Sequence, residues 1–131
     1  MALIKAVITS FSGDAPNGDQ TMSVVTWTGI TSTSTCEAVK LAHWADRSVQ
    51  LEGSFSSGTI TITGSNSGNA YATLHDMFSN SLEFTAAGLS QICEVTGYVK
   101  PAISGGGAGT SITITMLCRR PQDLLVIPPG A

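Results

Sequence analysis

Hydrophobic and polar residues alternate strictly in two segments of the chain. In residues 58–64 and 111–117, Ile and Thr alternate, with every Ile on one side of the pattern and every Thr on the other. Successive side chains of a β-strand point to opposite faces of its sheet. Each segment therefore predicts a half-buried strand, with isoleucines in the core and threonines outside.

A third alternating segment, residues 49–55, precedes the first of these and is joined to it by the short link Ser56-Ser57-Gly58. Such a link is typical of a β-hairpin. A turn-rich run after residue 64 leads into another extended segment, 70–74. These patterns predict a three-stranded meander over residues 49–74.

Further strands are predicted where apolar runs are separated by turn residues, and no segment shows a convincing helical period. They are residues 21–27, 36–41, 81–85, 91–95 and 98–103. Pro101 cannot donate to a ladder, so the strand at 98–103 is predicted to be an edge strand or to bend there. The fold class predicted is all-β, a jelly-roll-like antiparallel β-sandwich of about eight strands.

The length of 131 residues is that of one domain. Residues 1–120 are predicted to form a single β-sandwich domain, of which 1–20 supply an N-terminal strand and a turn-rich loop. Residues 121–131 form an apolar, Pro-rich C-terminal tail. Its four aliphatic residues are Leu124, Leu125, Val126 and Ile127. Because exposing each costs about 1.5–3 kcal/mol, the tail is predicted to dock on its own sandwich or on a neighbouring subunit.

Charged residues make up only 11% of the chain, and the net charge is −3. An average soluble domain has roughly 25% charged residues. A surface so poor in charge indicates either that partners or further copies cover it, or that it is a neutral, hydroxyl-rich surface. The scattered Lys and Arg residues form no basic stripe, so we expect no nucleic-acid ligand. No apolar stretch suits a signal peptide or a bilayer span, so we expect no membrane association and synthesis in a cytoplasm.

Candidate groups for catalysis are sparse. The close pairs of His and Asp are His43 with Asp46 and His75 with Asp76, and no activated nucleophile accompanies them. We therefore expect no enzymatic activity, no catalytic residues, no cofactor and no metal site. Three cysteines, Cys36, Cys93 and Cys118, are widely spaced beside apolar runs, which predicts buried free thiols.

Two tryptophans and two tyrosines are candidate contact residues. Trp27 follows two valines and is predicted to lie in the core. Trp44 lies in a polar stretch and is the best candidate for an exposed aromatic that anchors a protein interface. Trp44 or Tyr71 is the stacking face in an alternative hypothesis, in which the sandwich is a receptor-binding or glycan-binding module.

The run from Ser48 to Asn66, followed by Tyr71-Ala72-Thr73-Leu74, resembles small proteins encoded beside the major capsid protein of tailed bacteriophages. The segments Tyr98–Gly106 and Thr113–Arg120 resemble later motifs of the same group. The resemblance covers residues 48–120. Ser67 stands where the group has an acidic residue, which leaves this loop neutral.

That group resembles capsid decoration, or cement, proteins. The resemblance implies a jelly-roll-like sandwich that binds the outside of the capsid lattice, so the expected partners are the major capsid protein and further copies of this chain, with a dimer favoured over a trimer. The expected location is the capsid exterior of the virion, after assembly in the host cytoplasm. Trp44 and the residues Leu124 to Ile127 of the tail are the predicted interface contacts.

Overall fold

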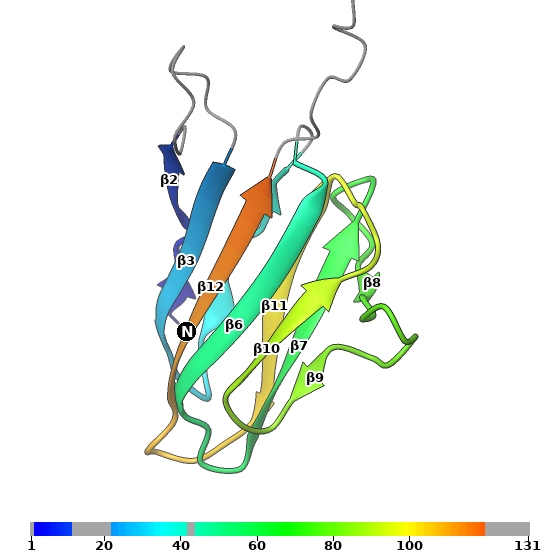
Figure 1. The fold of residues 1–131 in the computed structure, drawn as a ribbon. Coiled ribbons are helices and arrows are strands. Elements are labelled where there is room, and N and C mark those ends of the chain that lie inside the picture. The colour runs from blue at the N-terminus through cyan, green and yellow to red at the C-terminus, as the bar shows by residue number, and fades with distance from the viewer. Residues whose placement is uncertain (1, 12–21, 42–43, 120–131) are drawn as a thin grey trace, which may run out of the picture.

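The computed structural model describes residues 2–11, 22–41 and 44–119 (Figure 1). The predicted loop at 12–19 and the tail at 121–131 lie outside the described residues. The described part contains twelve strands and no helix. The strands are β1 (Leu3–Ile4), β2 (Val7–Phe11), β3 (Met22–Ile30), β4 (Thr35–Cys36), β5 (Val39–Lys40), β6 (Asp46–Ser54), β7 (Gly58–Ser65), β8 (Ala72–Thr73), β9 (Glu83–Phe84), β10 (Gly88–Ile92), β11 (Tyr98–Gly105) and β12 (Ser111–Arg119).

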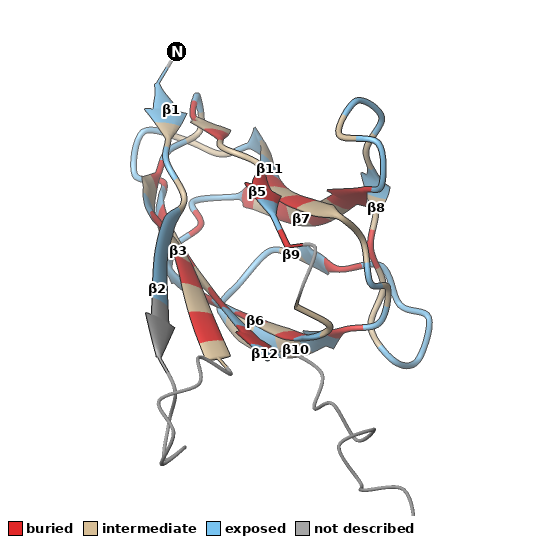
Figure 2. Cartoon of the chain, turned by 90° about the horizontal axis from the view of Figure 1, so that it is seen from above, coloured by how far each residue is buried: buried red, intermediate tan, exposed pale blue. Residues whose placement is uncertain are grey.

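The strands form two five-stranded antiparallel sheets and one small parallel pair. One sheet has the order β10-β6-β12-β3-β2. The other has the order β5-β11-β7-β8, with β9 also paired to β7, and β1 pairs with β4 outside both sheets. Seen from above, β6, β12 and β10 lie in one layer and β11 and β7 in the other (Figure 2). This confirms the predicted all-β antiparallel sandwich.

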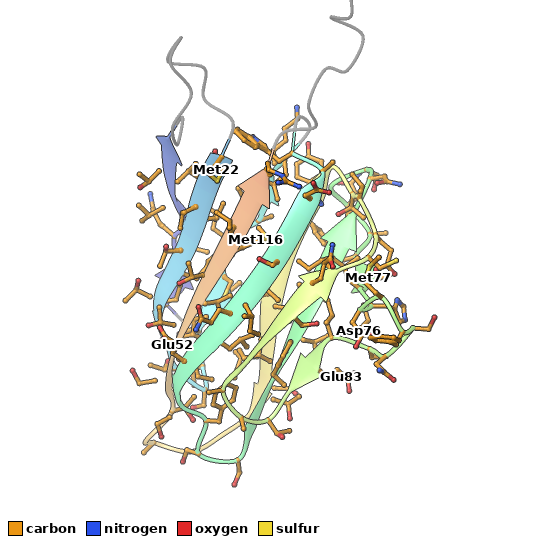
Figure 3. All side chains as sticks on the ribbon, viewed as in Figure 1. Met22, Glu52, Asp76, Met77, Glu83 and Met116 are labelled. Carbon is orange, nitrogen blue, oxygen red and sulfur yellow. The ribbon has the colours of Figure 1, made fainter. Side chains whose placement is uncertain are left out.

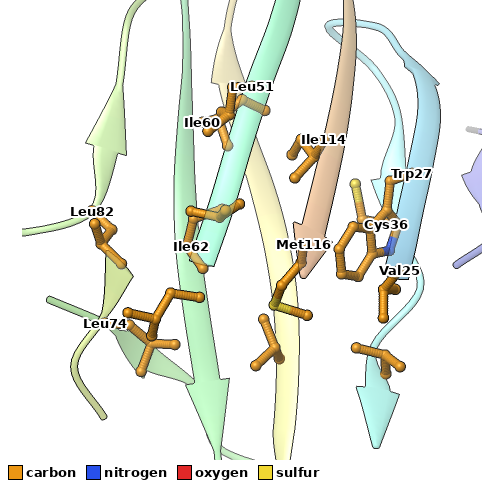
Figure 4. Close-up of a cluster of buried hydrophobic side chains, with 14 of the residues drawn as sticks. Val25, Trp27, Cys36, Leu51, Ile60, Ile62, Leu74, Leu82, Ile114 and Met116 are labelled. Atoms are coloured by element: carbon orange, nitrogen blue, oxygen red, sulfur yellow. The ribbon is translucent and has the colours of Figure 1, made fainter. Parts of the chain in front are cut away.

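The core lies between the two sheets and is built from the alternating strands (Figure 4). In β7 the isoleucines are buried and the threonines half-buried, and β12 follows the same pattern. Both strands were predicted in this orientation, and both are confirmed. Trp27 is fully buried, as predicted, and its Nε1–H donates a 2.8 Å hydrogen bond to the carbonyl oxygen of Glu37. The indole thus enters the core without an unpaired polar atom.

The hairpin predicted between β6 and β7 is wrong, because these strands lie in different sheets. Ser56 and Ser57 have φ values of 46° and 67°, and they turn the chain from one sheet to the other. Each strand then directs its apolar side into the space between the sheets. Alternation predicts that side, but it does not say whether two consecutive strands pair or face each other. The second half of the meander is confirmed, because β7 pairs with β8.

At Pro101, strand β11 is paired with a neighbouring strand on one side only. β11 pairs with β7 along its whole length, whereas β5 pairs only with Tyr98 and Val99. The register partner of Pro101 in β7, Ile62, directs its N–H and its carbonyl oxygen to Leu82 and Leu74 instead, so the missing N–H of Pro101 costs no ladder hydrogen bond with β7. The prediction that this strand is an edge at the proline is confirmed.

Two glycines of the first sheet have left-handed backbone conformations. Gly29, with φ 77°, belongs to an irregularity in β3 at which the register with β12 shifts by one residue. Gly53 in β6 has φ 116°, and a Cβ atom there would lie 2.2 Å from the carbonyl oxygen of Ser111. The close approach of β6 and β12 thus depends on glycine at this position.

Candidate interaction surfaces

The outer face of the sheet β10-β6-β12-β3-β2 is broad and almost free of charge. Cross-strand neighbours share a face of a sheet, so the register gives its rows directly. One row consists of Leu89, Gln50, Thr115, Thr26 and Val7. The next row consists of Gln91, Ser48, Leu117, Val24 and Thr9. These rows are hydroxyl, amide and aliphatic groups, with Leu89, Val7 and Leu117 well exposed.

Charged side chains on this face are confined to its two ends. Arg119 and Asp46 form an exposed ion pair at 2.7 Å at one end, and Glu52 lies toward the other. The fourth charged side chain of the sheet, Arg47, is buried on the inner side. The threonines that were predicted to face outward thus form a neutral central area. Such a surface can bind another protein without the free-energy cost of desolvating charged side chains.

A shallow groove crosses this face at the end that carries the ion pair. It is lined by Met22, Asp46, Arg47, Ser48, Gln91, Leu117 and Arg119. Arg119 is the last residue of β12 and the last one described before the tail. The predicted contacts Leu124, Leu125, Val126 and Ile127 lie outside the described residues, so their role stays a prediction.

Trp44 is half-buried and packs against the core, so the expectation of an exposed aromatic is wrong. The main-chain N–H of Trp44 donates a 3.1 Å hydrogen bond to the carbonyl oxygen of Leu41. The carbonyl oxygen of Trp44 accepts a 2.8 Å hydrogen bond from Nε of Arg47. The interface role predicted for Trp44 remains a prediction.

The loop between β8 and β9 holds the most exposed aromatic of the described residues, and sequence reasoning missed it. Phe78 is 85% exposed and Met77 57%. The loop projects from the side of the sandwich, and the side chains of Asp76 and Met77 lie there in Figure 3. The signal was present: Asp76 followed by Ser79-Asn80 is a turn-forming set that places the apolar pair at the tip.

Asp76 organises this loop through its side chain. Its Oδ1 atom accepts hydrogen bonds from the N–H groups of Phe78 at 2.8 Å and Asn80 at 3.0 Å, and its Oδ2 atom accepts from Asn80 Nδ2 at 3.2 Å. The main-chain bond from Asn80 is the largest cause that lowers the pKa of Asp76 below its ordinary value. Ser79 completes the turn with φ 68°. Among the described residues, the Asp76 carboxylate accepts its hydrogen bonds from Phe78 and Asn80 and not from His75, since Asp76 serves the turn.

The base of the loop is fixed by Glu94. Its Oε1 atom accepts a 2.7 Å hydrogen bond from the N–H of His75, and its Oε2 atom lies 2.5 Å from Nδ1 of the same residue. Burial raises the pKa of Glu94, but the hydrogen bonds from His75 outweigh burial and leave its pKa below the ordinary value. His75 and Glu94 thus form a structural pair with no nucleophile in the described contacts.

Two of the three cysteines are buried and the third is not. Cys36 and Cys118 are buried, and burial raises the pKa of each thiol to about 11. Cys93 is exposed, so the prediction of burial is wrong for this residue, whose strand β10 ends just before it. Within the described part of the chain, no group of three His, Cys, Asp or Glu side chains is placed to hold a metal ion. Among residues 2–11, 22–41 and 44–119 no helix is long and apolar enough to cross a membrane.

The chain is thus a two-layered β-sandwich. The outer face of the sheet β10-β6-β12-β3-β2 is neutral, and the loop between β8 and β9 presents apolar side chains at its tip. No model of a known protein family matches the chain, and no curated protein does. Among solved structures, the crystal structure of the SPBc2 prophage-derived protein YomS is similar to it, with a TM-score of 0.54 and 13% sequence identity. The match covers 76% of this chain and 96% of that one. At this identity the likeness shows the fold alone.

Proposed function

We propose that the chain is a structural protein of a bacteriophage particle, a decoration protein that binds the outer surface of the capsid and stabilises its lattice. The role is non-catalytic and requires no cofactor. The partners are the major capsid protein and further copies of this chain, with a dimer favoured over a trimer. The protein is placed on the capsid exterior after assembly in the host cytoplasm.

The observation that carries the proposal is the outer face of the sheet β10-β6-β12-β3-β2. Its central rows hold no charged side chain, and they combine threonines with exposed aliphatic groups such as Leu89 and Leu117. A scarcity of charged residues at the centre of a surface is typical of protein interfaces. The similar fold of YomS, a prophage-derived protein, adds support for a phage origin.

The stabilising effect follows from mass action. A protein that binds the assembled lattice, but not free capsid subunits, shifts the equilibrium toward the lattice by an amount that grows with its free concentration. No reaction is needed. A β-sandwich suits the task because its ladders hold a flat array of side chains in fixed register.

The test is binding of the purified chain to capsid shells that lack it, measured by co-sedimentation and by the melting temperature of the shells. We expect binding and a higher melting temperature. Thr115→Lys places a charge at the centre of the neutral face and should weaken binding at least about tenfold. Thr61→Lys is the matched control, because Thr61 is also half-buried and faces outward from the opposite sheet.

Three results would contradict the proposal in whole or in part. Purified particles without this chain, or shells that fail to bind it, would exclude the decoration role. Equal binding by Thr115→Lys and Thr61→Lys would exclude the neutral face as the contact. A chain ending at Arg120 tests the tail separately: if Leu124 to Ile127 contact the shell, this chain should bind more weakly and raise the melting temperature less.

The alternative, a glycan-binding module of a tail or fibre, gains little support from the aromatic side chains. Trp44 packs against the core, and the ring of Tyr71 is covered by Nζ of Lys100 at 5.2 Å from its centroid. A glycan array hit that is lost on Trp44→Ala would favour this alternative over capsid binding.

A further inference from the structure

The loop between β8 and β9 presents two apolar side chains in a way that a stable fold does not require. Phe78 is the most exposed of the large hydrophobic residues of the described chain, at 85%, and Met77 beside it is 57% exposed. Neither belongs to the core cluster or to the groups packed against it. Two adjacent exposed apolar side chains at a loop tip make a candidate contact site for another molecule.

The tip is organised by hydrogen bonds within the loop itself. Asp76 accepts three hydrogen bonds from Phe78 and Asn80 across the turn, and the main-chain groups of Asp76 bond to those of Asn80 and Ser79. The left-handed φ of Ser79 is maintained by this network. A side chain presented on a fixed loop loses little conformational entropy on binding.

The loop is also tied to the body of the sandwich. His75 donates its N–H to Glu94, its carbonyl oxygen accepts from the N–H of Cys93, and it forms a bridge with Ser81 at the neck of the loop. The tip therefore cannot swing away without breaking bonds to the strand connection after β10. A rigid projection of this kind fits a concave partner rather than a flat one.

Charge around the loop indicates the chemistry of that partner. Between residues 75 and 94 the charged residues are Asp76, Glu83 and Glu94, and there is no Lys or Arg. An acidic surround disfavours the anionic surface of a membrane and favours a basic or hydrogen-bond-donating rim. One aromatic and one thioether group match a pocket lined by apolar side chains, the arrangement in which interface anchors contribute most to binding.

The geometry points to the Met77-Phe78 tip as an anchor that inserts into an apolar pocket with a basic rim on the surface of a protein shell. This inference rests on the proposed function in taking the capsid shell as the partner. It adds a second contact at the side of the sandwich, distinct from the neutral sheet face. Phe78 is the central residue, and Asp76 is a positioning residue that acts through the turn.

The experiment measures the Kd of the full chain for capsid shells that lack it, by co-sedimentation. Phe78→Ser should bind at least about tenfold more weakly than the parent chain. Asp76→Ala keeps the phenyl ring of Phe78 but loses the hydrogen bonds of the turn. Its affinity for the shells should therefore lie between those of the parent chain and Phe78→Ser. Leu3→Ser is the matched control, because Leu3 is 55% exposed on β1, at the other side of the sandwich in Figure 2, and should bind like the parent chain.

The same variants are examined for self-association by sedimentation equilibrium and for binding to vesicles of phosphatidylcholine with and without phosphatidylglycerol. We expect no effect of Phe78→Ser in either measurement. Loss of self-association would assign the tip to a second copy, and loss of vesicle binding would assign it to lipid; each would overturn the inference.

Failures of the two proposals are distinguishable. A parent chain that does not bind shells overturns the decoration role and the anchor together. A parent chain that binds, with Phe78→Ser binding equally well, overturns the anchor alone. Binding of Asp76→Ala equal to that of the parent chain would overturn its positioning role. Because Phe78 and Asp76 lie outside the core, unchanged thermal melting of both variants separates lost contacts from lost folding.

Discussion

The guanidinium of Arg47 donates a 2.6 Å hydrogen bond to the carbonyl oxygen of Thr96, which joins two segments 49 residues apart. Arg47 is only 2% exposed. It also donates to the carbonyl oxygens of Leu41 and Trp44, and no carboxylate of the described residues accepts a hydrogen bond from it. Burial lowers the pKa of Arg47, against the opposing effect of Cys118. The cation is thus held by main-chain oxygens and closes one end of the sandwich.

Replacing Arg47 should destabilise the fold strongly. Arg47→Met removes the donors for three main-chain oxygens in a buried place, so we expect the free energy of unfolding to fall by about 2–4 kcal/mol. Urea unfolding monitored by tryptophan fluorescence measures the loss. Arg119→Met removes an exposed ion pair with Asp46 and should cost less than about 1 kcal/mol. Similar losses in the two variants would show that the network around Arg47 contributes little.

Gly53 should be far less tolerant of a side chain than Gly29. Both have left-handed φ values, but a Cβ at Gly53 would lie 2.2 Å from the carbonyl oxygen of Ser111, whereas one at Gly29 meets no atom within 4 Å. Gly29→Ala should therefore cost only the backbone strain of about 1–2 kcal/mol. Gly53→Ala should cost at least about 3 kcal/mol, because β6 and β12 must separate. Thermal melting of both variants tests which of them loses more stability. A larger loss for Gly29→Ala than for Gly53→Ala would contradict this prediction.

Thiol chemistry should distinguish Cys93 from the other two cysteines. Cys93 is exposed, whereas burial raises the pKa of Cys36 and Cys118 to about 11. Since the thiolate is the reactive form, a disulfide reagent at pH 8 should modify one thiol in the folded protein and all three after unfolding. Cys93→Ser should remove the fast phase. Fast modification of that variant in native buffer would contradict the burial of Cys36 and Cys118.

The loop that carries Phe78 should respond to acid in a defined direction. Hydrogen bonds from Asn80 and Phe78 lower the pKa of Asp76 below its ordinary value of 3.8. Because the folded pKa is the lower one, the turn is fully formed above pH 3.8 and loosens as the pH falls through the folded pKa. Amide resonances of Phe78 and Asn80 should therefore titrate together with the Asp76 carboxyl. Titration at or above 3.8 would show that these hydrogen bonds are not maintained in solution.

Local patterns predicted much of the strand content but placed some boundaries wrongly. The strand predicted at 91–95 is β10, Gly88–Ile92, and the one predicted at 36–41 is divided into β4 and β5. In both cases the strands are defined by their pairing: β10 pairs with Arg47 to Leu51 of β6, whereas β4 pairs with β1 and β5 with β11. A sequence window does not contain that partner, so propensity alone does not determine where pairing stops.

The interaction surfaces were predictable only in outline. Low charge and outward threonines predicted a neutral surface, and the register shows it as one sheet face. The tip at Met77-Phe78 was missed because apolar residues are usually assigned to the core. Their exposure depends on the turn that the hydrogen bonds of Asp76 stabilise, because this turn places both side chains away from the two sheets.

The sequence by itself determined which side of each strand is buried, because alternation has the same period as the pleat. It also determined the edge at Pro101, because a missing N–H is a property of the residue. Only the tertiary structure decided that β6 and β7 face each other across the core, that Arg47 is buried among main-chain oxygens, and that Phe78 is exposed. These outcomes depend on contacts between segments far apart in the chain, whose free energies no local pattern contains.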